Sequence, residues 1–256
     1  MVQTSSLTFP DPSRLEKLLT ELSSAKFSPA EHNLAERLSY LIGVSGSINL
    51  ARSLKQLPAK VESKVSDDDV SPEADLASAC QQMMLVITSS FVAEEGAEYH
   101  ETQLKVPSAN GLRLEALQGY DPYRRFYVAH QTEMALGLQA LRRRIRASLS
   151  GISAELHQLA KLDEILDENL TVDTRRLFNV IPKLLEERFN FLLEEHRKKT
   201  NENSSDDLEY WLLPEGWLSL FYHDMREMLL AEFDVRLQPI LGLLEALNEQ
   251  KDINHD

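Results

Sequence analysis

The chain has 256 residues, a net charge of −14, 43% apolar residues and only nine glycines. This length provides for one large domain or two small ones, and the negative charge opposes binding to nucleic acid and to anionic membranes. The single cysteine excludes an internal disulfide, and the sequence lacks the run of about 18 apolar residues that typifies a membrane span. The opening residues lack the basic start and apolar core of a signal peptide, so we expect a soluble, cytoplasmic protein.

Residues 1–58 are predicted to form an N-terminal unit of three helices. The first has Pro12 in its first turn, where the missing N–H of proline costs no hydrogen bond. Its apolar stripe consists of Leu15, Leu18, Leu19 and Leu22. A capping box at Ser28 begins the second helix, and the third ends before Pro58. The polar residues 59–70 have no periodicity, which predicts a flexible linker.

Residues 71–248 are predicted to form the main helical bundle. A cap at Ser71 begins a helix that runs to about Glu95. Its inward side chains are Leu76, Cys80, Met83, Met84, Ile87 and Phe91. A second cap, at Asp121, begins a long helix that runs to about Leu149. Its inward side chains are Tyr123, Tyr127, His130, Met134, Leu138, Leu141 and Ile145, and Gly137 leaves room for a close neighbour.

Two further helices are predicted between Gly151 and the polar stretch 200–210, which we expect to be a disordered loop. The first spans about Ser153 to Leu170. The second is capped by Asp173 and kinks at Pro182, because the proline ring removes a backbone donor and crowds the preceding turn.

The stretch Trp217–Leu247 predicts a long final helix, because its apolar residues recur at steps of three and four. Glu232 and Arg236 lie on the same face, one turn apart, where they can pair. The pattern continues through Pro239, and residues 249–256 are predicted to fray. The whole pattern predicts an all-α fold, a multi-helix bundle with long antiparallel helices and short loops.

The sequence yields no catalytic residues, no cofactor-binding residues and no metal ligands. It contains neither glycine-rich phosphate-binding pattern, and no histidine has the glutamate three residues earlier that di-iron bundles use. His223 and Glu227 lie one turn apart, but two ligands do not make a metal site. We interpret His130 as a hydrogen-bonded core histidine and Cys80 as a buried small hydrophobe.

Arginines cluster between residues 121 and 150, where six of them face only two carboxylates and give a local charge of +4. The 57 residues from 200 to 256 carry −10. Helical periodicity places Arg125, Arg143 and Arg146 opposite the apolar stripe and Arg142 on its flank. The simplest interpretation is a solvated face. The alternatives are a ridge that docks an acidic segment, the chain's own C-terminal region included, and a surface that binds nucleic acid.

Glu232 and Arg236 also allow two interpretations. The first is a structural ion pair at the rim of the core, with packed stems and solvated heads. The second is a specificity element in an interface, because a desolvated pair disfavours wrong partners.

Several segments together resemble a proteobacterial helical family of unknown function. They are RLSYLIGVSGSINLARSL near the start, PYRRFYVAHQTEMALGLQALRRRIRASL, LAKLDEIL, IPKLLEERFNFL, and the closing WLSLFYHDMREMLLAEFDVRLQPILGLLEAL. The resemblance covers most of the chain outside 59–70 and 200–210. It implies likeness to accessory proteins of type III Zorya antiviral defence, which are typically encoded beside proton-driven membrane motors of the flagellar-stator and outer-membrane-anchor kind.

The leading hypothesis is therefore a non-enzymatic cytoplasmic interaction protein. The resemblance implies that it is an accessory or effector component and that its partners are a stator-like motor and the peptidoglycan-anchoring subunit of that motor. The alternative is a nucleic-acid-binding effector that uses Arg125, Arg142, Arg143 and Arg146. The candidate interaction residues are these four arginines with Glu232 and Arg236.

Overall fold

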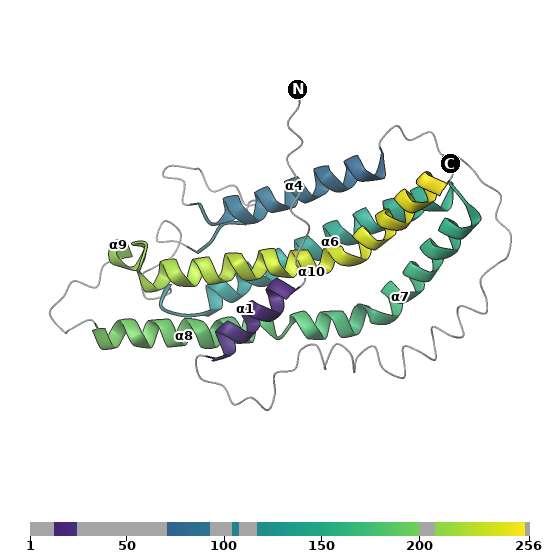
Figure 1. Cartoon of the computed structure of the whole chain (residues 1–256). Coiled ribbons are helices and arrows are strands. Elements are labelled where there is room, and N and C mark those ends of the chain that lie inside the picture. The colour runs from purple at the N-terminus through teal and green to yellow at the C-terminus, as the bar shows by residue number, and fades with distance from the viewer. Residues whose placement is uncertain (1–12, 25–70, 93–103, 108–116, 200–207, 254–256) are drawn as a thin grey trace, which may run out of the picture.

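A computed structural model describes residues 13–24, 71–92, 104–107, 117–199 and 208–253. Every regular element in these ranges is a helix, which confirms the predicted all-α fold. The helices are α1 (Ser13–Ser24), α4 (Pro72–Ser90), α6 (Asp121–Ser150), α7 (Ala154–Phe178), α8 (Ile181–Lys199), α9 (Leu208–Trp211) and α10 (Trp217–Ile253) (Figure 1). The predicted second and third helices, the linker and residues 200–207 of the predicted loop lie outside the described residues. Residues 208–210 of that loop are not disordered as predicted, because they belong to α9.

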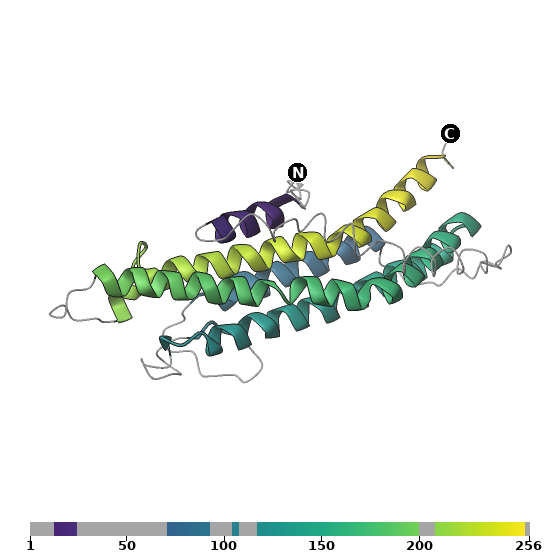
Figure 2. The same ribbon diagram turned by 90° about the horizontal axis from the view of Figure 1, so that it is seen from below.

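Helix α10 is the central element of the bundle, because it contacts each of the other described helices. Phe221, Met225 and Leu229 have no exposed surface, so the apolar stripe read from the sequence is the contact surface of this helix. As predicted, α10 continues through Pro239. It also extends to Ile253, beyond the point where fraying was predicted. Figure 2 shows that its C-terminal part bends, and Leu243, Leu244 and Leu247 in this part are buried.

Helix α1 packs on α8 and α10. Leu15 and Leu19 are buried there, and the guanidinium of Arg14 pairs with Glu227 of α10. The first predicted helix therefore lies against the main bundle, whereas the division into an N-terminal unit and a main bundle remains a prediction.

Helix α4 has the predicted cap, since the Ser71 hydroxyl accepts the backbone N–H of Ala74 at 3.1 Å. It ends at Ser90, five residues before the predicted end. The reason is that the carbonyl of Ser90 accepts the N–H of Val106 at 2.8 Å instead of continuing the helical ladder. Met84 was predicted to be buried but is exposed, because α4 contacts the bundle along a single face.

Helix α6 buries the whole predicted inward face. A methyl group on Gly137 would lie 2.7 Å from the terminal carbon of Met83, so this glycine does permit the close approach of α4. The predicted cap at Asp121 is wrong. Tyr120 is the capping residue, it makes no side-chain cap bond, and Asp121 is the first residue of the helix.

The predicted boundary between α7 and α8 is wrong. Helix α7 begins next to the predicted start, with Ser153 as its capping residue, but runs unbroken through Asp173 to Phe178. The break comes at residues 179–180, and Pro182 lies in the first turn of α8 instead of kinking a helix interior. A proline is tolerated there because first-turn N–H groups have no helical partner.

Aromatic side chains fill the end of the bundle where α6, α8 and α10 meet. The rings of Phe189 and Phe221 lie 5.1 Å apart, and Tyr123 lies 5.3 Å from Phe189. Trp211 and Trp217, which flank the turn before α10, are buried with ring centroids 5.4 Å apart. The turn at residues 212–216 therefore caps this aromatic cluster.

Substituting Gly216 with alanine is expected to lower the free energy of unfolding by about 1–3 kcal/mol, the range for overpacking. A methyl group there would overlap the backbone carbonyl of Trp211 and lie 2.6 Å from the carbonyl oxygen of Tyr210. The matched control is Gly242→Ala in α10, where nothing lies within 4 Å. This control should stabilise the protein by about 0.5–1 kcal/mol, because alanine is the better helix former. Urea unfolding of both variants measures the contrast, and equal stabilities would contradict it.

None of the helices in the described ranges is long and apolar enough to cross a membrane.

Candidate functional site

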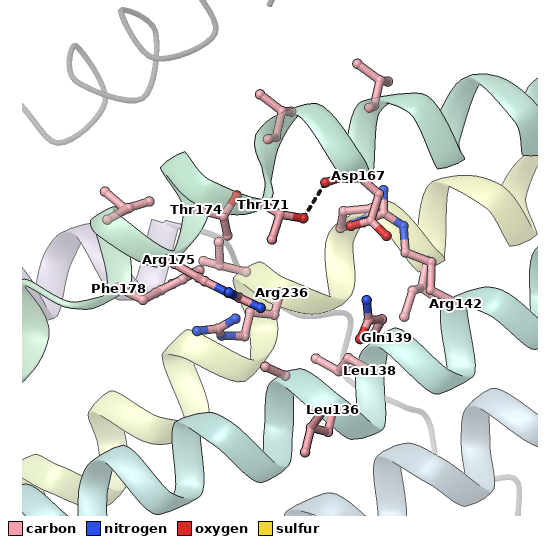
Figure 3. Close-up of a pocket in the computed structure, with 17 residues that line it drawn as sticks. Leu136, Leu138, Gln139, Arg142, Asp167, Thr171, Thr174, Arg175, Phe178 and Arg236 are labelled. Atoms are coloured by element: carbon pink, nitrogen blue, oxygen red, sulfur yellow. Dashed lines mark hydrogen bonds and ion pairs between the residues drawn. The ribbon is translucent and has the colours of Figure 1, made fainter.

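A cavity of about 310 Å³ lies between α6, α7 and α10 (Figure 3). Its walls are mainly apolar, formed by Leu138, Leu166, Leu170, Leu177, Val235 and Ile240. The polar groups that reach it include the guanidinium groups of Arg142, Arg175 and Arg236. Two of these arginines are predicted interaction residues, so the structure brings part of the predicted set to one place.

One end of the cavity is closed by an ionic cluster of Arg142 and Arg146 on α6 with Asp163 and Asp167 on α7. Arg142 donates to Asp163 at 2.5 and 2.8 Å and to Asp167 at 2.8 Å. Arg146 donates to Asp163 at 2.6 Å and to Asp167 at 2.7 Å. Both pairs have a spacing of four residues, so one turn of each helix presents two charges to the other helix.

This cluster corrects the predicted arginine face. Arg146 was placed opposite the core, but both Arg142 and Arg146 are largely covered because α7 folds back along α6. Their acidic partner is α7 and not the C-terminal region. Arg125 and Arg143 are exposed and form no ion pair with any other described residue. The four arginines therefore do not make one continuous basic surface.

The other end of the cavity adjoins a buried carboxylate, Glu232 of α10. Its Oε1 accepts Nε and Nη2 of Arg236 at 2.8 and 2.6 Å. Its Oε2 accepts the hydroxyl of Tyr127 at 3.1 Å and the amide of Gln131 at 2.8 Å. All four contacts donate to the carboxylate, which is the pattern that an ionised group requires.

The Glu232–Arg236 pair was correctly predicted to be on the apolar face, but its location is deeper than the predicted rim. Glu232 is 0% exposed. Burial raises the pKa of the Glu232 carboxyl above its ordinary value, and Arg236 opposes this shift. The guanidinium of Arg236 lies over the ring of Phe178, 3.9 Å from its centroid, so the cation is held by an aromatic face as well as by the carboxylate.

Gln131 connects this pair to the break between α7 and α8. Pro182 has no N–H, so the carbonyl of Phe178, four residues earlier, loses its helical donor. The amide of Gln131 donates to that carbonyl at 3.1 Å as well as to Glu232. The break is thus compensated by a side chain from α6.

The remaining titratable candidates are parts of the core or the surface. Burial lowers the pKa of His130 to about 4, and the Nε2 atom of this residue has no partner among the described residues. This ring is in the core as predicted, but its Nε2 lacks the predicted hydrogen bond. Cys80 is buried, and burial raises the pKa of the thiol to about 11. Glu227 pairs with Arg14 and Arg226, and the Nδ1 atom of His223 lies 3.3 Å from Nη2 of Arg226.

Within the described ranges, no group of three or more potential metal ligands comes together.

Sequence reasoning missed Asp163, Asp167, Gln131 and Arg175. For the two aspartates a signal was present, because their four-residue spacing matches that of Arg142 and Arg146. For Gln131 and Arg175 there was none, since their roles depend on which helix each residue faces.

The fold and the cavity define a helical-bundle protein in which partly buried charge pairs join α6 to α7, and side-chain hydrogen bonds join α6 to Glu232 of α10. The chain belongs to the family described as "Protein of unknown function (DUF3348)", whose model matches residues 1–249. This confirms the predicted membership of a family of unknown function, and the match also includes the two segments that the resemblance left out. Neither the curated proteins nor the solved structures gave a match.

Proposed function

We propose that this protein is a non-enzymatic, cytoplasmic interaction protein. In this proposal it is an accessory or effector component of a bacterial antiviral defence system of the type III Zorya kind. Its partners would be a proton-driven, stator-like membrane motor and the peptidoglycan-anchoring subunit of that motor. The sequence resemblance supports the choice of partner, and an exposed apolar surface supports an interaction role.

That surface, which we name the end surface, consists of Tyr210, Leu213 and Leu220. These side chains line a hollow of about 300 Å³ beside Trp217, at the end of the bundle where α9 lies (Figure 1). Tyr210 is 60% exposed and Leu213 is 52% exposed. An aromatic ring and two leucines that line one hollow leave apolar surface in contact with water. Such exposed apolar patches commonly mark protein interfaces.

The rim of the end surface is charged. Glu195 and Lys199 of α8 and Glu215 of the turn before α10 line the same hollow. An apolar centre with a charged rim is the usual anatomy of a protein interface, in which the centre supplies affinity and the rim supplies orientation.

Co-purification of the tagged full chain with the two membrane proteins from detergent-solubilised cells tests the proposal. Leu213→Glu is expected to reduce recovery of the motor at least tenfold, since it places a charge at the centre of the apolar surface. The matched control is Val172→Glu, which alters an equally exposed apolar residue (55%) on α7. This control should leave recovery unchanged.

Two results would overturn the proposal. One is recovery of the motor that is the same for Leu213→Glu and for the unaltered chain. The other is full protection against phage in cells that lack this protein but retain the membrane components.

A further inference from the structure

We infer that the cavity between α6, α7 and α10 binds a small amphipathic carboxylate, an acid group attached to an apolar chain. The inference concerns a different face from the end surface and does not depend on the interaction role. It rests on the shape of the cavity, the character of its walls and the charge left uncompensated at one side.

The walls of the cavity are suited to contact with an apolar chain. Leucines from α6 and α7 and aliphatic residues of α10 face the cavity, which is partly open to solvent. A volume of about 310 Å³ is at the lower end of the range for small-molecule sites, which are typically apolar with a few polar groups that fix orientation. A wholly apolar ligand would supply no partner for Arg175, which also lines the cavity.

The charges favour an anion. Arg142 is compensated by its two aspartates, and Arg236 is compensated by Glu232. Arg175 also lines the cavity, and it forms no ion pair with a residue in the described part of the chain. One positive charge therefore remains.

Arg236 adds a donor beside that charge. Its Nε and Nη2 atoms are occupied by Glu232, whereas no described residue accepts a hydrogen bond from its Nη1 atom. In Figure 3 the side chains of Arg175 and Arg236 point toward one another from α7 and α10. Two guanidinium groups that point toward one another favour a planar carboxylate, which accepts hydrogen bonds through both oxygens.

Octanoate is a suitable probe, and isothermal titration with the full chain measures its binding. We expect saturable binding that is about tenfold weaker in Arg175→Gln, because a charge-assisted hydrogen bond is lost. The matched control is Arg176→Gln, the neighbouring exposed arginine, which pairs with Asp173 and does not line the cavity. This control should bind octanoate within twofold of the unaltered chain.

Two further measurements distinguish the contribution of the carboxylate from that of the apolar chain of octanoate. Octanol has the same chain without the charge, so it should bind about tenfold more weakly than octanoate to the unaltered chain and equally to Arg175→Gln. Ala135→Phe fills the cavity from α6 and should abolish binding of both ligands. Circular dichroism verifies that each variant is folded.

Equal octanoate affinity in Arg175→Gln and Arg176→Gln would overturn the inference, as would the absence of saturation by octanoate. Binding of an acidic, leucine-containing peptide in place of octanoate would also overturn it, since the cavity would then be a contact site for a protein partner.

Discussion

Replacing Glu232 with leucine is expected to lower the free energy of unfolding by about 3–5 kcal/mol, the cost of leaving one charge of a buried pair uncompensated. Arg236 is largely covered and would lose the acceptor for two of its donors. Tyr127 and Gln131 would each lose an acceptor as well. Equilibrium unfolding in urea, followed by circular dichroism, measures the loss.

A double variant makes this expectation specific to the pair. Glu232→Leu combined with Arg236→Leu removes both charges and should recover most of the lost stability, apart from about 1 kcal/mol for the unpaired hydroxyl of Tyr127. Glu245→Leu, at an exposed position on the same helix, is the control and should change stability by less than about 0.5 kcal/mol. If the double variant were as unstable as the single one, the loss would come from packing and not from an unpaired cation.

Substituting His130 with leucine is expected to make the protein less sensitive to acid. Burial holds the pKa of this imidazole at about 4, against an ordinary value of 6.5. Between these values the unfolded chain binds a proton that the folded chain does not. Stability is therefore lost as the pH falls through this window. Removing the imidazole removes that contribution.

The magnitude follows from the size of the pKa difference. Between pH 7 and pH 4.5 the unaltered chain should lose about 2–3 kcal/mol more stability than His130→Leu. Urea unfolding of both proteins at several pH values gives this difference directly. Glu232 titrates with the opposite sign, since its pKa is raised, but it is present in both proteins and cancels in the comparison. Parallel pH profiles would show that His130 is accessible to protons in the folded state.

The spacing of apolar residues predicted the helices well, because burial of one face of a helix sets that spacing. The inward face of α6 and the stripe of α10 could be read from steps of three and four residues, and both are buried as expected. Helix ends were harder to predict. Asp173 and Pro182 resemble a start and a kink, yet α7 runs through the first, and the second lies in the first turn of α8. Local signals of this kind are weaker than packing against neighbouring helices.

The candidate site could be predicted only in part. Glu232 and Arg236 lie one turn apart, so their pairing required nothing beyond the sequence. The depth of that pair required knowledge of Tyr127 and Gln131, which are about 100 residues away on another helix. Likewise, the arginines of α6 could be singled out from the local charge, but the orientation of Arg142 toward Asp163 was set by the path of α7. Contacts between helices are invisible to a pattern read along one helix.

The two hydrogen bonds of the Gln131 amide affect how the protein unfolds locally. One nitrogen serves both the carbonyl of Phe178 and the carboxylate of Glu232, so a single group joins α6 to the end of α7 and to the middle of α10. Opening α6 deprives both other segments of a hydrogen bond in an apolar setting, and opening either of those segments deprives Gln131 of an acceptor. Their backbone amides should therefore exchange with solvent deuterium at a common rate, as parts of one cooperative unit.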